Sequence, residues 1–290
     1  MKRRRFLSLA AAFVCSPALA QADTWSGQAL GAEVSVTLHG PRDMTQRALA
    51  DVPRLLVNFE EAFSLFRPTS QLSQLNKMGQ LRGPNALMRT LMSHADNAYR
   101  VTGGLFDPTI QPLWTALAQA GDIGHARKAL GWDRIRYSDQ MIELQTGQAL
   151  TFNGIAQGFA TDVMRLLLRK YGAETALVNI GEQAALGGSF TLGIEDPVYG
   201  HIGTRKLRDM AIATSSPSAL WIGDHPHILG PRGEKPLWST VSVEAKSATM
   251  ADAMSTAAVF MERDALKELK VAARLHRITL VDADGDIQTL

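Results

Sequence analysis

Cysteine is almost absent from this sequence. The single cysteine, Cys15, lies within the first 20 residues of the 290-residue chain. We expect those 20 residues to be removed as an export signal, so no thiol would remain in the mature protein. This excludes disulfides, thiol catalysis and thiolate metal ligands. Any metal ion must then be held by oxygen atoms or imidazole nitrogens.

Long apolar runs, basic stripes and repeats are missing as well. After Ala20 no apolar stretch reaches the roughly 20 residues that a membrane-spanning helix needs. Lys and Arg form no stripe of the kind that binds nucleic acid, and the chain has neither an internal repeat nor a low-complexity linker. We therefore expect no nucleic-acid partner and no stable membrane insertion of the mature chain.

The first 20 residues have the composition of an export signal. Four basic residues occupy positions 2–5, an apolar run extends from Phe6 to Val14, and small residues precede a cleavage position after Ala20. The stretch R-R-R-F-L also fits the twin-arginine pattern, with a generic basic start as the alternative. This segment carries four of the 30 basic and none of the 28 acidic residues, which leaves the remainder with a net charge of −2. We expect a signal at residues 1–20 and a periplasmic mature protein at residues 21–290.

Residues 151–172 predict an amphipathic helix of about four turns. Apolar side chains recur every three to four positions between Phe159 and Leu167, as on the buried face of a helix. Asn153 stands where a helix cap is expected, and Gly172 follows a basic pair, the usual order of stop signals. The other helices and strands of the chain are expected to pack around this helix.

Two glycines, Gly154 and Gly158, bracket the first turn of this helix. Glycine lets a backbone approach a ligand closely, and the unpaired N–H groups at a helix start attract anions, so a phosphate would fit there. The alternative is that two small residues allow the helix to pack tightly against a neighbour. The local pattern leaves both interpretations open.

The rest of the chain mixes period-2 and period-3.6 patterns, which predicts an α+β fold. The strand at 190–194 is expected to neighbour that at 175–180 and to form a β-α-β-like unit with the central helix. Thr69 or Ser70, and Asn85, are expected helix caps. We expect strands at 32–38, 175–180, 190–194, 211–216, 241–245 and 277–281, helices at 43–63, 86–101, 250–261 and 263–269, and a hairpin made by 135–144 and 149–152.

Three oxygen-bearing side chains share one face of a predicted helix. Asp252, Ser255 and Thr256 stand at positions i, i+3 and i+4. Mg²⁺ prefers oxygen ligands and uses few protein carboxylates, so this face is a candidate metal site. The alternative is that Thr249 and Asp252 form a T-x-x-D capping box, which explains Asp252 without a metal but leaves Thr256 unexplained.

Two further residues have both a chemical and a structural interpretation. His227 follows Pro226 in a loop, where an imidazole suits proton transfer, although lone loop histidines are commonly only solvated. Asp107 and Thr109 lie in the turn G-G-L-F-D-P-T, where they could hold a ligand. The sequence Asp-Pro-Thr is also ordinary capping chemistry for the segment that follows, and this second interpretation is favoured.

Seven blocks of sequence, in order, resemble the ApbE family, the FAD:protein FMN transferases, over roughly residues 30 to 265. They are hydrophobic-R-P-x-S at 65–70, G-x-F-D-P-T at 104–109, G-[IV]-A-K-G-[FY]-x-x-D at 154–162, V-N-x-G at 178–181, T-S at 214–215, H-I-x-D-P at 227–231 and A-D-A-x-S-T at 251–256. The resemblance implies a single domain of two lobes, with mixed β-sheets flanked by helices and the flavin between the lobes.

The resemblance also implies an activity, two ligands and a set of site residues. Such a protein would bind FAD and Mg²⁺ and attach FMN through a phosphoester to a Thr or Ser of an acceptor flavoprotein, releasing AMP. His227 would be the base, and the metal ligands would be Gly154, Asp252, Ser255 and Thr256. The flavin would contact Phe66, Leu105, Phe106, Asp107, Thr151, Gln157 and Leu237.

Several positions depart from the family pattern. The lysine after G-I-A is Gln157, the aspartate of H-I-x-D-P is Gly230, and G-G-D after V-N-x is G-E-Q at residues 181–183. The variants G-I-A-Q-G and N-x-G-E resemble the NosX-like subgroup linked to nitrous oxide reductase. The expected function is therefore FMN transfer in that respiratory system, and the alternative is a non-catalytic protein that binds or delivers flavin.

Overall fold

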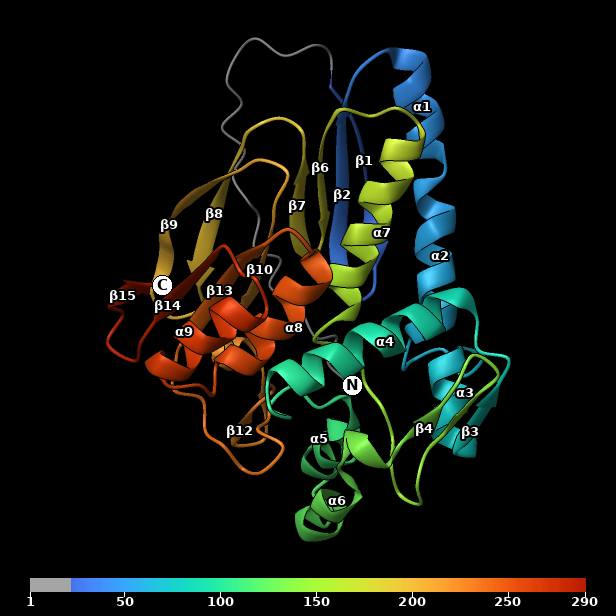
Figure 1. Cartoon of the computed structure of the whole chain (residues 1–290), viewed down its shortest axis with the longest axis vertical. Helices are drawn as coiled ribbons and strands as arrows, with labels where there is room; N and C mark the ends of the chain where they lie inside the picture. Colours follow the sequence, from blue (N-terminus) through green and yellow to red (C-terminus); the bar gives the residue numbers. More distant parts are fainter. Residues whose placement is uncertain (1–21) are drawn as a thin grey trace.

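The computed structural model describes residues 22–290, and the expected signal at residues 1–20 lies outside them. An eight-stranded sheet frames the described part (Figure 1), and every strand pairing in it is antiparallel. In spatial order its strands are β1 (Ala22–Ala29), β2 (Ala32–His39), β6 (Thr175–Ile180), β7 (Glu182–Leu186), β10 (Ala211–Ser215), β13 (Thr240–Ala245), β14 (Arg277–Val281) and β15 (Ile287–Thr289).

The two faces of this sheet are covered differently. Side chains alternate along a strand, so Val178 and Ile180 of β6 join the main core beneath the helices, whereas Leu177 faces the other way. There Leu177 packs against a separate two-stranded sheet formed by β8 (Phe190–Asp196) and β9 (Gly200–Leu207). Because both faces are covered, β6 is buried at four of its six positions.

Helices cover the first face. The long helices α7 (Ala156–Lys170) and α8 (Ala248–Ala258) pack against each other, α7 over β6 and β7 and α8 over β10 and β13. The remaining helices are α1 (Arg42–Ala50), α2 (Val52–Phe63), α3 (Gln71–Met78), α4 (Ala86–Val101), α5 (Gln111–Ala118), α6 (Ile123–Ala129) and α9 (Arg263–Ala272).

A second region hangs below the sheet in Figure 1. It holds α3, α5, α6 and a small sheet of β3 (Gln80–Arg82), β5 (Met141–Glu143) and β4 (Arg136–Tyr137). Helix α4 lies between this region and the sheet and contacts both α2 and α8.

The expected α+β fold is confirmed. Three short helical turns, η1 (Pro108–Ile110), η2 (Trp132–Arg134) and η3 (Pro217–Ala219), and a two-stranded ribbon, β11 (Trp221–Ile222) with β12 (His225–Pro226), complete the elements.

The predicted helix at 43–63 is in fact two helices. Helix α1 ends at Ala50, and α2 begins at Val52 with a proline in its first turn. Pro53 has no N–H group and its ring obstructs the preceding turn, so one continuous helix through this point is unfavourable. The capping predictions at Ser70 and Asn85 are confirmed, since each side chain accepts a hydrogen bond from the backbone three residues on.

Two strand predictions were wrong in their partners. Residues 149–152 form no strand, and the hairpin is made within residues 136–143, by β4 and β5. The strand at 190–194 exists as part of β8 but pairs with β9, while β6 has β2 and β7 as neighbours. No β-α-β-like unit therefore forms around α7. Within residues 22–290, no helix combines the length and apolar character needed to cross a membrane.

Candidate functional site

The start of α7 packs directly against α8. A Cβ atom on Gly158 would overlap the carbonyl oxygen of Ala248 and would lie 2.7 Å from the Cβ of Asp252. Only glycine fits between the two helices at this point. Of the two interpretations of Gly158, tight packing is the one that the structure confirms.

The expected capping residues of both helices are corrected. Asn153 does not cap α7, because the helix begins after Ile155 and Asn153 donates its N–H to the Thr151 hydroxyl at 3.2 Å. Nor do Thr249 and Asp252 form a capping box, because α8 begins after Ser247, whose hydroxyl accepts from the Met250 N–H. The capping box therefore does not explain Asp252.

Asp252 is buried in this contact, with only 3% of the residue exposed. Its Oδ2 accepts one backbone hydrogen bond, from the Gly158 N–H at 2.9 Å. A carboxylate thus accepts from the helix start, where a bound phosphate was one of the two interpretations. Burial raises the pKa of Asp252 to about 7, although the Gly158 hydrogen bond favours the charged form.

A second carboxyl group lies near Asp252. Glu182 on β7 accepts the Thr214 N–H at its Oε2, 3.2 Å away, and its backbone oxygen accepts the Thr161 hydroxyl of α7. Burial, followed by repulsion from Asp252, raises the pKa of Glu182 well above its usual value. In the sequence, Glu182 is notable only because it departs from the family pattern G-G-D. Its proximity to Asp252 results from the packing of β7 against α8.

Hydroxyl groups complete this cluster. The Ser215 hydroxyl at the end of β10 lies 2.8 Å from Ser255 Oγ and 3.5 Å from Thr256 Oγ1. Ser255 also donates to the carbonyl oxygen of Asp252. The Gly154 backbone approaches Thr256 so closely that a Cβ atom there would lie 2.8 Å from Thr256 Oγ1. The structure thus brings together the Gly154, Asp252, Ser255 and Thr256 named from the sequence.

The donors available here are oxygen atoms. Among residues 22–290 no three His, Cys, Asp or Glu side chains are grouped as a metal site. One carboxylate, two hydroxyl-bearing residues and a nearby backbone still suit Mg²⁺, which binds few protein ligands and keeps water and substrate phosphate as the others. A buried carboxyl with a raised pKa gains most from a cation. The cluster therefore fits the expected ion.

Asp162 is the last residue of the G-x-x-x-G-x-x-x-D block. It lies on α7 and contacts the start of α8, whereas Asp252 lies on α8 and contacts the start of α7. From α7 it accepts hydrogen bonds from the N–H groups of Ala248 and Thr249 and from the hydroxyls of Ser247 and Thr249, all between 2.8 and 3.0 Å. Arg165 Nη1 lies 3.7 Å from it. Asp162 caps α8 from another helix, a role that no local sequence signal indicates because the partners are 85 to 87 positions away.

His227 is held by two backbone carbonyls. Its Nδ1 lies 3.1 Å from the Pro217 oxygen and 3.2 Å from the Leu220 oxygen. Carbonyl oxygens only accept, so Nδ1 must carry the proton, which leaves Nε2 as the acceptor. Burial lowers the pKa of His227 and outweighs the two carbonyls, so the imidazole is neutral at pH 7. The turn η3 that anchors it begins two residues after Ser215.

Asp107 caps the turn η1, as its structural interpretation predicted. Its Oδ1 accepts the N–H of Thr109 at 2.8 Å and the hydroxyl of Thr109 at 2.6 Å. Burial nevertheless raises the pKa of Asp107. The same turn is tied to the segment that leads into α7, because the Thr151 N–H donates to the Pro108 oxygen. Phe106 is buried, so its ring belongs to the core.

The other expected flavin contacts are more scattered. Phe66 is 94% exposed and Leu237 is 41% exposed, whereas Leu105 is partly buried against the core. The Gln157 amide is engaged within the protein, donating to the Leu30 carbonyl at 3.2 Å and packing against Gly181. The structure leaves the flavin roles of these residues as predictions.

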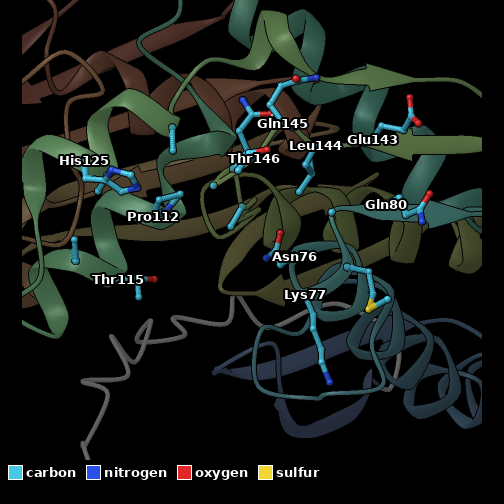
Figure 2. Close-up of a pocket in the computed structure, with 18 of the residues that line it drawn as sticks. Asn76, Lys77, Gln80, Pro112, Thr115, His125, Glu143, Leu144, Gln145 and Thr146 are labelled. Atoms are coloured by element: carbon cyan, nitrogen blue, oxygen red, sulfur yellow. The ribbon is translucent and has the colours of Figure 1, made fainter.

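A wide groove of about 890 Å³ lies in the second region (Figure 2). Pro112, Thr115 and His125 line one side of it, and Gln80 and Glu143 line the other. None of the site residues named from the sequence lines this groove. One connection between the groove and the site is the segment before Thr151, which Asn76 holds by two hydrogen bonds to Leu150.

Comparison with known proteins places this geometry in a family. A sequence model of the ApbE family matches residues 30–279. The chain is 26% identical over 265 residues to the FAD:protein FMN transferase of Chlamydia pneumoniae, covering 81% of this chain and 82% of that protein. It is 27% identical over 207 residues to the protein of the same name from Klebsiella pneumoniae (strain 342), covering 63% and 65%.

Solved structures show the same fold. The apo form of the flavinyl transferase ApbE from Pseudomonas stutzeri superimposes with a TM-score of 0.81 at 20% identity, over 95% of this chain and 97% of that one. The ApbE protein of Thermotoga maritima gives a TM-score of 0.82 at 23% identity, over 92% and 96%.

Proposed function

The chain belongs to the ApbE family and is by that membership a flavinyltransferase, and from this premise we propose that it transfers FMN from FAD to a Thr or Ser hydroxyl of an acceptor flavoprotein, with Mg²⁺ as cofactor. The observation that carries the proposal is the α7–α8 contact. It places the buried Asp252 carboxyl one helical turn before Thr256, whose side chain meets the Gly154 backbone, with His227 anchored on the turn that follows Ser215.

The residues at the α7–α8 contact would hold the cation. Asp252 supplies the charge, and the Thr256 hydroxyl and the Gly154 backbone supply neutral oxygens, with Ser255 beside them. Bound Mg²⁺ would neutralise the FAD pyrophosphate and stabilise AMP as the leaving group. Asp252 is rigidly held for this role, since its Oδ2 is fixed by the Gly158 N–H.

His227 would act as the general base. Its protonated Nδ1 is fixed by two carbonyls, so Nε2 can accept the proton of the acceptor hydroxyl. The hydroxyl oxygen then bonds to the FMN phosphorus, and the bond from that phosphorus to the bridging oxygen breaks. AMP leaves with that oxygen, and the proton stays on Nε2. A lowered pKa keeps His227 in the unprotonated form that this step needs.

The flavin would lie between the sheet and the second region. Asp107, on the turn that is tied to Thr151, would position it together with Phe66, Leu105 and Phe106, and Gln157 and Leu237 would contact it from the sheet side. We further propose export to the periplasm and an acceptor in the respiratory system of nitrous oxide reductase, as in the NosX-like subgroup. Cell fractionation of a strain that produces the full chain tests the location.

Mass spectrometry tests the activity. A candidate acceptor domain with a Thr or Ser flavinylation site is incubated with residues 21–290, FAD and Mg²⁺. We expect the mass of one FMN to be added, with release of one AMP, and both to be lost with EDTA or in Asp252→Asn. Asp264→Asn, which removes an exposed ion pair with Lys267, is the matched control. No added mass, in parallel with an active family member, would contradict transfer.

One observation favours the alternative of a non-catalytic flavin-binding protein. Gln157 stands where the family pattern has lysine, and its amide is hydrogen-bonded to Leu30. A protein of this kind would bind FAD tightly without releasing AMP. Titration of FAD fluorescence alongside the transfer assay separates the two, because the alternative predicts tight binding that Asp252→Asn leaves unchanged.

A further inference from the structure

The loop after His227 folds back on itself at Gly230. Gly230 is buried, and a Cβ atom there would lie 2.5 Å from the Glu234 carbonyl oxygen and 2.7 Å from Glu234 Oε2. No side chain fits at position 230 in this conformation. The Glu234 carboxylate lies in the space into which a side chain at residue 230 would extend.

The same carboxylate organises Arg232. Glu234 Oε2 accepts the Arg232 N–H at 2.9 Å, and Glu234 Oε1 accepts Arg232 Nε at 2.8 Å. Because Arg232 is held at both its backbone N–H and its side-chain Nε, the side chain has little conformational freedom. Its other guanidinium N–H groups therefore point in a fixed direction. Glu234 is mostly buried, with 23% of its side chain exposed, although Arg232 is 62% exposed.

Arg232 uses one of its remaining donors to join two parts of the chain. Its Nη1 donates to the Gly103 carbonyl at 3.1 Å, 129 positions away in the sequence. Gly103 opens the turn that leads to Asp107, and His227 lies five residues before Arg232. A weaker second link runs from Arg127 Nη1 of α6 to the Pro231 oxygen at 3.5 Å.

We propose that Glu234 supplies, from four positions downstream, the carboxylate that the ApbE pattern carries at position 230, and that through Arg232 it positions the His227 loop against the 103–107 turn. Glu234 and Arg232 are positioning residues in this proposal. Its catalytic part rests on the proposed function, whereas the link between the two segments does not. The family departure at Gly230 is then a relocation of the carboxylate within the loop.

Hydrogen exchange tests the link without reference to activity. The amides of Arg232 and Gly233 report on the loop, and those of Gly104, Leu105 and Phe106 report on the turn. In Glu234→Gln and in Arg232→Met we expect both segments to exchange at least several times faster than in the wild type. Asp264→Asn, the exposed-pair control, should leave both unchanged. Faster exchange in the loop alone would overturn the proposal.

Kinetics test the use of the link. We expect AMP release at saturating FAD to fall about tenfold in Arg232→Met, with melting temperatures within about 3 °C of the wild type for every variant. AMP release in the double variant Glu234→Gln/Arg232→Met should be no slower than in Arg232→Met alone, because the two residues act as one unit. Unchanged kcat in Arg232→Met would refute the positioning role. If the wild type releases no AMP, the proposed function fails, and the exchange data alone decide whether the link exists.

Discussion

Two aspartates make reciprocal contacts between α7 and α8. Asp162 of α7 reaches the start of α8, and Asp252 of α8 reaches the start of α7. Asp162 accepts four hydrogen bonds, two from backbone N–H groups and two from hydroxyls. Asp252 accepts one, from Gly158, and is more deeply buried.

The difference lies in how completely each carboxylate is satisfied. Four donors satisfy Asp162, so it stabilises the fold and has little capacity left for a ligand. Asp252 has a single donor, so its carboxylate keeps lone pairs without hydrogen bonds in a buried position. Its pKa rises to about 7 as a result. A buried group that the protein leaves under-satisfied marks a functional site better than its residue type does.

The largest expected effect comes from Asp252→Asn. We expect AMP release to fall by at least about 100-fold, because the one negative ligand of the cation is lost. Urea unfolding at pH 8 should show equal or greater stability than the wild type, because a neutral amide replaces a poorly satisfied buried carboxylate. A variant that is both inactive and clearly less stable would mean that Asp252 serves the fold, as Asp162 does.

Asp162→Ala should give the opposite result. Losing four hydrogen bonds to a carboxylate leaves the start of α8 without its acceptor, and we expect about 3 kcal/mol less stability in urea unfolding. The kcat of the folded protein should stay within about tenfold of the wild type, because Asp162 has no role in cation or substrate binding in the proposed function. Isothermal titration with Mg²⁺ checks this, since a lost binding signal in Asp162→Ala at full folding would contradict the division of roles.

Local signals were sufficient for most elements of this fold. Ser70 and Asn85 cap their helices because Ser and Asn bond to backbone within three residues, which a sequence shows directly. The single helix predicted at 43–63 failed at Pro53, a local signal that the apolar period concealed. The pairing of β8 with β9 also had a local signal, since only residues 197–199 separate the two strands and Asp196 forms the turn by accepting the N–H groups of Val198 and Tyr199, but a strand at 200–207 was not predicted.

The candidate site depends more on contacts between residues that are distant in the sequence. The spacing of Asp252, Ser255 and Thr256 placed them on one face because a helix fixes that geometry. Glu182 and Asp162 reach this contact from β7 and α7, and only tertiary packing brings them there. The link from Arg232 to Gly103 likewise joins residues that no pattern relates.

The pH dependence of stability should follow Asp252. Its pKa is about 7 in the folded protein and about 3.9 when unfolded, so between these values the native state binds more protons than the unfolded state. The contribution of Asp252 to the free energy of unfolding, measured without Mg²⁺, should therefore be greatest below pH 4. It should fall by about 2 kcal/mol between pH 5 and pH 7. Urea titrations at several pH values, with EDTA, measure the slope.

Asp252→Asn is the control for that slope. It should remove the part of the slope that comes from Asp252 and leave the part that comes from Glu182, whose pKa burial raises in the same direction. Adding Mg²⁺ to the wild type should stabilise it more at pH 8 than at pH 5, because the cation competes with a proton for the carboxylate. Equal stabilisation at both pH values would place the cation elsewhere.

The two glycines at the start of α7 give the finest test of the comparison. In Gly158→Ala the new methyl meets the Ala248 backbone, which cannot move aside, so we expect a net loss of about 1 to 2 kcal/mol despite the better helix propensity of alanine. In Gly154→Ala the methyl meets the Thr256 side chain, which can rotate. Stability should change by less than about 1 kcal/mol, while AMP release falls about tenfold because Thr256 leaves its place beside Asp252. If instead Gly154→Ala unfolds the protein and Gly158→Ala only slows it, the structural and functional sides of this contact have been assigned the wrong way round.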